Sequence, residues 1–103
     1  DLTIVSKLVN MQNLFVNDEF VTSLSGIENL QRLEVFCMDG TNATDISPLT
    51  KLPRLQVVRL QGVPIVEFAP LFSCHSLQEV AADSRQKEKI EQLGDPVFMI
   101  FVE

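Results

Sequence analysis

The sequence predicts a solenoid, in which a short structural unit repeats and each unit packs mainly against its neighbours. The first observation is a fixed period: apolar residues recur every 22 positions, as in the segments 30–38 and 52–60. The second is that the positions between them keep the same spacing, since Pro48 is followed by Pro70. A period of this size with this apolar spacing is typical of solenoids built from short strands and tight turns.

The repeat extends to both sides of this central pair of segments. Its four apolar positions hold Leu8, Met11, Leu14 and Val16; Leu30, Leu33, Phe36 and Met38; Leu52, Leu55, Val58 and Leu60; and Cys74, Leu77, Val80 and Ala82. The last set is the weakest, and terminal repeats are usually atypical. Counting back by the same period places residue 1 inside a repeat. We therefore expect the chain to be a C-terminal fragment of a longer array, with the alternative that residues 1–7 form a short cap.

Each repeat is expected to contain one strand and one tight return. The strand segments are 13–17, 35–39, 57–61 and 79–83. They alternate apolar and other residues, which is typical of a strand with one buried face, and they all run the same way, which predicts a parallel sheet. The returns contain Pro48 and Pro70, which are compatible with the first turn of a helix. Because only about ten residues remain for each return, we expect single 3₁₀ or irregular turns on the convex face.

A different pattern follows the last repeat. Residues 84–93 predict a short amphipathic helix, with Asp83 or Ser84 able to cap its N-terminus and Gly94 following its C-terminus. Val97–Val102 is apolar and rich in β-branched and aromatic residues, which predicts a final strand beside the fourth repeat. This helix and strand should close the C-terminal end of the core.

The pattern LxxLxxLxL followed by TDISPLxxL resembles the 22-residue leucine-rich repeats of the internalins and related bacterial proteins. The match is best in residues 30–52. In these terms the chain is one leucine-rich-repeat domain, 1–103, with repeats in 2–82 and a helix–strand cap in 83–103. The resemblance implies a protein-binding module that is secreted or displayed at a cell surface, although a cytoplasmic location stays open.

One position departs from the family pattern. The family usually has Asn after the strand, where its side chain bonds neighbouring turns. Here that position holds Glu19, Thr41 and Val63. A regular asparagine ladder is therefore not expected in this chain.

Composition narrows the classes of function. The chain carries 14 acidic and 8 basic side chains, for a net charge of −6. The Lys and Arg residues form no stripe, which argues against a nucleic-acid partner. No apolar run approaches the roughly 20 residues that a membrane-spanning helix requires, so no membrane insertion is expected. No pattern indicates a cofactor or a metal site, and none is expected.

The strand pattern sorts the remaining side chains onto the concave face, which is the usual binding surface of a solenoid. One outward column should contain Phe15, Cys37, Arg59 and Ala81. Apolar side chains there lie beside an arginine, with Asp18, Asp39 and Asp83 at the rim, and an apolar group with a polar rim favours a protein interface. The residues expected to contact a partner are Phe15, Val35, Cys37, Asp39, Val57, Arg59 and Gln61.

We therefore expect a protein-binding module that acts through its concave face. The alternative is a structural end piece, which caps the core of a larger receptor or enzyme and has no ligand of its own. An enzyme is not expected, because Cys37 on the concave face and His75, two repeats along, should lie too far apart for a nucleophile–base pair. Cys74 should be a core residue on the other side of the sheet from Cys37, so no disulfide is expected.

The two edges of the sheet are expected to be exposed. The first strand, near Leu14, should have no neighbour on its outer side, and the last strand at 97–102 is apolar on both faces. Natural proteins usually shorten, charge or cover such edges, because unpaired strands associate with other chains. The sequence therefore predicts self-association through one of these edges rather than through the concave face.

Overall fold

The computed structural model of the protein describes residues 1–102, and Glu103 at the end of the predicted cap lies outside the described part. The strands are β1 (Asn13–Phe15), β2 (Val35–Cys37), β3 (Val57–Arg59), β4 (Glu79–Ala82) and β5 (Met99–Val102). The 3₁₀ turns are η1 (Thr3–Val5), η2 (Ile27–Asn29), η3 (Ser47–Lys51) and η4 (Ala69–Ser73), and the α-helix is α1 (Ser84–Gln92). The order of elements confirms the predicted alternation of strands and 3₁₀ returns, followed by a helix and a strand.

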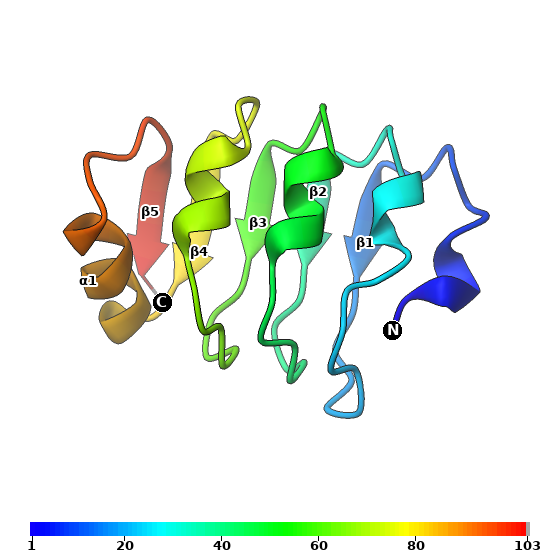
Figure 1. The fold of residues 1–103 in the computed structure, drawn as a ribbon, viewed down its shortest axis with the longest axis horizontal. Helices are drawn as coiled ribbons and strands as arrows, with labels where there is room; N and C mark the ends of the chain where they lie inside the picture. Colours follow the sequence, from blue (N-terminus) through cyan, green and yellow to red (C-terminus); the bar gives the residue numbers. More distant parts are fainter. Residues whose placement is uncertain (103) are drawn as a thin grey trace.

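The five strands form one parallel sheet in chain order, β1-β2-β3-β4-β5 (Figure 1). Asn13 pairs with Val35, Val35 with Val57 and Val57 with Glu79, so each of these pairs is 22 residues apart. The period of the sequence is therefore the register of the sheet. The last strand departs from it, because Met99 pairs with Glu79, only 20 residues earlier. The architecture confirms the predicted solenoid.

The chain leaves β2 and β3 through tight turns that need glycine. Gly40 and Gly62 have φ angles of 84° and 74°, which side-chain-bearing residues rarely adopt. At Gly40 a Cβ atom would also collide with the side chain of Asn17 in the preceding turn. The returns then form η3 and η4, each with a proline in its first two positions. Proline fits there because the first N–H groups of a helical turn have no partner within it.

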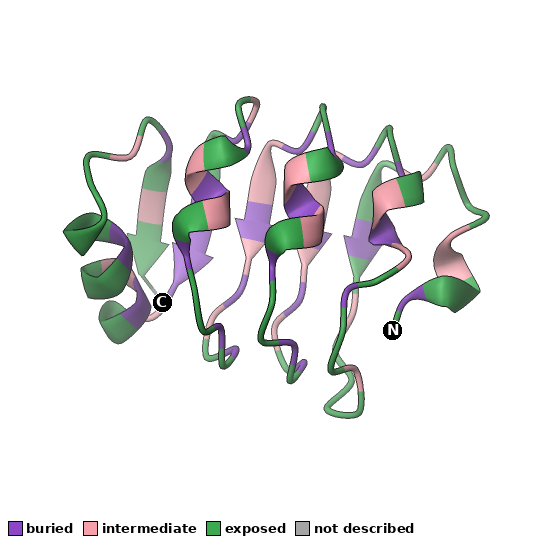
Figure 2. Ribbon diagram, viewed as in Figure 1, coloured by how far each residue is buried: buried purple, intermediate pink, exposed green. Residues whose placement is uncertain are grey.

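The core lies between the sheet and the row of 3₁₀ turns, and the periodic apolar positions fill it (Figure 2). In the middle of the array these side chains have no contact with solvent: Leu30, Leu33, Phe36, Met38, Leu55, Val58 and Leu60 are all 0% exposed. Each stacks against its equivalents in adjacent repeats. Burial of apolar surface therefore stabilises the array as a whole, rather than any single repeat.

Some boundaries differ from the prediction. β1, β2 and β3 contain three residues each and are shorter than the predicted strand segments. β5 begins at Met99 rather than Val97, because Val97 is 93% exposed while Phe98 turns into the core and packs its ring 5.5 Å from that of Phe72. α1 ends at Gln92 rather than Leu93.

Other contacts replace the missing asparagine ladder. The Thr41 hydroxyl donates to the carbonyl of Met38 at 2.8 Å, within its own turn. The Asn42 side-chain amide, one position later, donates to the carbonyl of Glu19 in the preceding turn at 2.7 Å. Val63 has no polar side chain that could form such a bond. The carbonyl groups of its turn instead accept hydrogen bonds from a side chain of α1.

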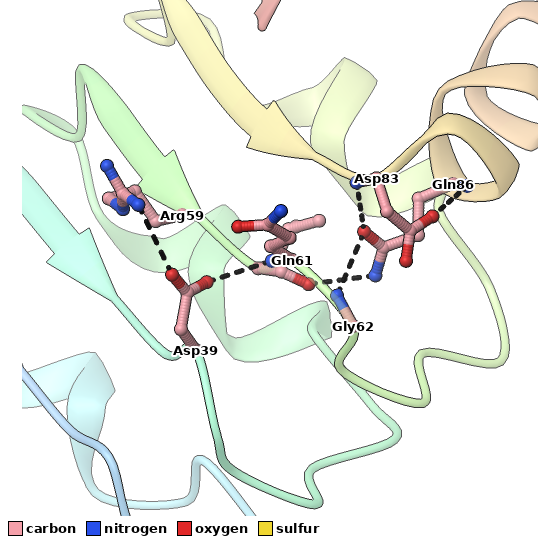
Figure 3. A network of polar contacts seen from close by, with 7 residues as sticks. Asp39, Arg59, Gln61, Gly62, Asp83 and Gln86 are labelled. Carbon is pink, nitrogen blue, oxygen red and sulfur yellow. Dashed lines mark hydrogen bonds and ion pairs between the residues drawn. The ribbon is translucent and has the colours of Figure 1, made fainter. Parts of the chain in front are cut away.

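Gln86 of α1 supplies that bond and closes the end of the array (Figure 3). Its Nε2 donates to the carbonyls of Leu60 and Val63 at 2.8 and 3.1 Å, and its Oε1 accepts from the N–H groups of Gly62 and Asp83 at 3.3 and 2.9 Å. The Asp83 side chain in turn accepts from the N–H of Gln86 at 2.8 Å, which completes a capping box. Asp83 is thus the N-cap residue, one of the two that the sequence allows.

Candidate functional site

The candidate site is the concave face, which is formed by alternate side chains of the strands. In β2 and β3 the central residues Phe36 and Val58 are buried, and the residues on either side of them are half-buried. Because side chains on a strand alternate between faces, these flanking residues form the concave face. Sheet pairing aligns Phe15, Cys37 and Arg59 in one row across three strands.

The predicted apolar residues lie close together on this face. Phe15 is 68% exposed, whereas Val35, Cys37 and Val57 are half-buried. Val35 and Val57 are direct partners in the sheet, so they form a continuous apolar floor. A phenylalanine ring that projects so far into solvent is a candidate anchor, since aromatic side chains carry large contact areas in interfaces.

Asp39, just after β2, organises the polar part of the face (Figure 3). One carboxylate oxygen lies 3.5 Å from Nη2 of Arg59, and the other accepts the backbone N–H of Gln61 at 2.9 Å. The bond to Gln61 joins equivalent turns of adjacent repeats, so Asp39 also supports the fold. The Arg59–Asp39 ion pair is partly exposed, and such pairs contribute only about 0–1 kcal/mol.

Two shallow hollows lie on the concave face and share Arg59. The first, of about 380 Å³, is lined by Phe15, Val16, Asn17, Cys37, Asp39 and Arg59. The second, of about 270 Å³, is lined by Val57, Arg59, Glu79, Ala81 and Phe101. Five of the seven predicted contact residues line these hollows. Of the other two, Val35 pairs with Val57 and Gln61 bonds Asp39.

One residue of the predicted outward column is not available at the surface. Ala81 is only 7% exposed, because its small side chain lies between those of its sheet partners Arg59 and Phe101. Met99 and Phe101 of β5 are 63% and 44% exposed, and they share the face of their partners Glu79 and Ala81. Sequence reasoning missed this addition, because the spacing changes after α1 and counting by 22 no longer finds the neighbour. The alternation of side chains along residues 97–102 was the one feature of the sequence that could have indicated that Met99 and Phe101 share a face.

Cys37 and His75 line different hollows of the structure. Both Cys37 and Cys74 are free, and Cys74 is buried while Cys37 is half-buried. Burial raises the pKa of the Cys74 thiol to about 11. His75 is exposed and lines a different hollow, beside Glu34 and Arg54 at the N-terminal ends of the strands.

Two further features of residues 1–102 concern metal ions and membranes. No group of three or more His, Cys, Asp or Glu side chains in this part could hold a metal ion. No helix in this part is long and apolar enough to cross a membrane. The concave face presents apolar side chains, the Arg59–Asp39 ion pair and hydrogen-bonding groups.

Comparison with known proteins places the fold in a class. No family model matches the sequence, and no curated protein matches it. The structure is similar to that of an internalin from Listeria monocytogenes, with a TM-score of 0.72 and 23% identity over 81% of this chain and 25% of that one. It is also similar to internalin C2 from the same organism, with a TM-score of 0.74 and 29% identity over 81% of this chain and 37% of that one.

The protein is therefore an internalin-like leucine-rich-repeat protein, which confirms the resemblance drawn from the 22-residue period. The chain spans between a quarter and about two fifths of the length of these two structures, with 25% and 37% of them covered. The class suggests interaction with other proteins in general, because solenoids of this kind present extended concave surfaces.

Proposed function

We propose that this protein binds another protein through the concave face of its sheet. The observation that carries the proposal is the group of accessible apolar side chains on β1, β2 and β3, together with those of Met99 and Phe101 on β5. Isolated apolar residues on a surface are ordinary, but a contiguous group with a polar rim is typical of an interaction site. The internalin-like class supports the same function.

The contact residues would act in two groups. Phe15 would insert into the partner as the main anchor, while Val35, Cys37 and Val57 would form the apolar floor against which the partner packs. Interfaces usually derive most of their energy from a few such anchors near the centre, surrounded by polar residues that exclude water. The remaining residues, Asp39, Arg59 and Gln61, would provide that polar surround and fix the orientation of the partner.

Charge indicates the chemistry of the partner. The two hollows of the concave face are lined by the carboxylates of Asp39 and Glu79 and by the guanidinium of Arg59, and the whole chain has a net charge of −6. Acidic surfaces steer basic partners toward them and repel acidic ones. We therefore infer a partner that presents apolar side chains flanked by Lys or Arg.

A second candidate function is structural: the chain would close the end of a larger repeat array and bind nothing itself. The capping of the last turns by Gln86 and the complete burial of Ile90 favour this role for the C-terminal part. The two functions differ in what they require of the concave face. A capping role does not require the side chains of Phe15 and Val57 on the concave face.

A displayed peptide library selected against the wild-type chain tests the proposal. Selected peptides should combine apolar and basic residues, and Phe15→Ser or Val57→Ser should weaken their binding about tenfold or more, as expected for loss of an apolar anchor. Circular dichroism and thermal melting establish that each variant is folded. Val66→Ser is the matched control, because Val66 is 82% exposed in a turn outside the concave face.

Two outcomes of this selection would contradict the proposal. If the library yields no binder, or if every selected peptide binds the Phe15→Ser and Val57→Ser variants as well as the wild type, the concave face is not a binding surface. The structural role would then be the better account.

A further inference from the structure

We propose that the hollow over Ala81 on the concave face binds an arginine side chain of the partner protein. This hollow is lined by Val57, Arg59, Glu79, Ala81 and Phe101. The inference rests on the function proposed above, because it assigns one residue of the partner to one place on the binding surface.

A single small residue creates this hollow. Sheet pairing places Arg59, Ala81 and Phe101 in one row across β3, β4 and β5. The side chain of Ala81 is a methyl group and is 7% exposed, whereas its two neighbours in the row have long or aromatic side chains. These neighbours therefore form walls on both sides of a floor at Ala81. The space between them, of about 270 Å³, has room for one long side chain rather than for a helix or a strand.

The lining of the hollow is mostly apolar and contains one carboxylate. Val57 and Glu79 are partners in the sheet and form the adjacent row of the same face. Val57, Ala81 and Phe101 supply apolar surface, and the methylene groups of Arg59 extend it. The carboxylate of Glu79 is exposed and forms no ion pair within residues 1–102. A side chain with an apolar stem and a cationic end complements such a lining.

The carboxylate of the neighbouring hollow differs, because it is already bonded. One oxygen of Asp39 lies 3.5 Å from Nη2 of Arg59, and the other accepts the N–H of Gln61 at 2.9 Å (Figure 3). This ion pair draws the guanidinium of Arg59 toward Asp39, which follows β2, whereas Glu79 lies on β4, on the other side of β3. A cation that enters the hollow over Ala81 therefore meets the carboxylate of Glu79 and an arginine whose charge is balanced by Asp39.

The same lining favours arginine over lysine. A guanidinium is planar and can donate two parallel hydrogen bonds to one carboxylate, here that of Glu79. Its flat face also stacks on aromatic rings, and the 44% exposed ring of Phe101 lies in the same hollow. An ammonium group is a more strongly hydrated point charge, so it gains less in a hollow that removes part of its water. We therefore expect one position of the partner to require arginine.

Peptides selected from the displayed library described above provide the probe, because they can be synthesised and altered. One position of the selected peptides should be arginine. Its replacement by citrulline, which has nearly the same shape but no charge, should weaken binding about tenfold or more, and replacement by lysine should weaken it less. Glu79→Gln in the protein should weaken binding of the unaltered peptide by a similar factor. Glu79 is exposed, so this variant should keep its fold.

Combining the two changes locates the contact. If the arginine binds Glu79, the citrulline peptide should bind the Glu79→Gln variant about as well as it binds the wild type, because the contact is already lost. Glu88→Gln is the matched control, since it removes the same charge from an exposed position on α1, outside the concave face. It should change binding of the unaltered peptide less than about twofold, because solvent and salt screen distant surface charges.

Several outcomes would overturn the proposal. They are selected peptides without a shared arginine, full affinity after either single change, and losses from the two changes that simply add. If Phe15→Ser still weakens binding of the same peptides in these cases, the concave face binds a partner and only the arginine site is wrong. A library that yields no binder would overturn both this inference and the proposed function.

Discussion

The first and the last repeats of the described solenoid are built alike but covered differently. At the C-terminal end, α1 and β5 cover the last turns, and Ile90 and Phe98 are buried. At the N-terminal end, η1 covers only part of the core: Leu2 is 4% exposed, but Leu8 is 50% exposed. A solenoid buries each repeat against its neighbours, so the burial of a core position depends on what packs against it. The difference shows that α1 and β5 give the fourth repeat a cover that the first repeat does not receive from within residues 1–102.

The hydrogen bonds that side-chain amides donate to backbone carbonyls also differ in burial between these two regions. At the C-terminal end, the carbonyls of Leu60 and Val63 are satisfied by the buried side chain of Gln86. Near the N-terminal end, the carbonyl of Glu19 accepts from Asn42, whose side chain is exposed. Water can replace an exposed donor, but it cannot reach a buried one. A hydrogen bond from a side-chain amide should therefore contribute more to stability at the C-terminal end, where α1 covers the core, than near the N-terminal end.

The largest expected difference concerns apolar truncation at the two ends. Ile90→Ala should lower the free energy of unfolding by about 2–5 kcal/mol, because it leaves a cavity in a fully buried site. Leu8→Ala should cost less than about 1 kcal/mol, since half of its surface is already exposed. Urea unfolding measures both. Equal costs would mean that the N-terminal end is as well covered as the C-terminal end.

Gln86→Ala should lower the free energy of unfolding by about 1–3 kcal/mol, because it leaves buried carbonyls and N–H groups without partners. Asn42→Ala is the matched change in the exposed bond and should cost about 0.5 kcal/mol. Thermal melting of the two variants provides the comparison. A larger loss for Asn42→Ala would show that the ladder position, rather than the helix, holds the turns together.

The buried thiol of Cys74 should make the stability of the protein depend on pH in the alkaline range. Burial raises the pKa of its thiol from 9.0 to about 11, so the unfolded chain loses this proton first as the pH rises. Stability from this group is fully present below about pH 9 and is lost toward pH 11, by about 1–2 kcal/mol. Denaturant unfolding of the wild type and of Cys74→Ala over this range isolates the effect. If the two proteins keep a constant difference in stability, the thiol is not buried.

The same residue can be compared with Cys37 by its reactivity. A thiol reagent should modify the half-buried Cys37 in the native protein and Cys74 only after unfolding, because reactivity follows exposure and thiolate content. Mass spectrometry of the native and denatured protein counts the modified thiols. Modification of both cysteines at equal rates in the native state would contradict the assignment of Cys74 to the core.

The smallest expected effects are those on the concave face. Phe15→Ser should change the free energy of unfolding by less than about 0.5 kcal/mol, since the ring is 68% exposed at the edge of the sheet. Phe101→Ser at the other end should cost somewhat more, about 1 kcal/mol, because the ring is 44% exposed and lines a hollow over Ala81. A large loss of stability at Phe15 would place its side chain in the core and shift the strand register by one residue.

Much of the fold could be predicted from the sequence because the spacing of its apolar residues repeats throughout residues 2–82. The 22-residue period of the apolar residues equals the register between neighbouring strands, so finding the period also identifies the core residues and the concave face. Five of the seven predicted contact residues line the hollows of that face. Their contact with a partner stays a prediction.

The contributions of β5 lie outside what the period can predict. Met99 and Phe101 reach the concave face only because α1 returns the chain to the sheet with a spacing of 20 rather than 22 residues. Ala81 is covered for the same reason, since Phe101 becomes its neighbour. Alternating residues predict a strand, but they do not say which strand it will pair with.

By itself, then, the sequence determined the repeating unit: a short parallel strand, a glycine turn, a 3₁₀ return and a row of core side chains. These follow from local pattern and from a period that every repeat shares. Only the tertiary structure decided how α1 and β5 pack against the fourth repeat and which carbonyls Gln86 satisfies. The physical reason is that these contacts join segments that the period does not relate.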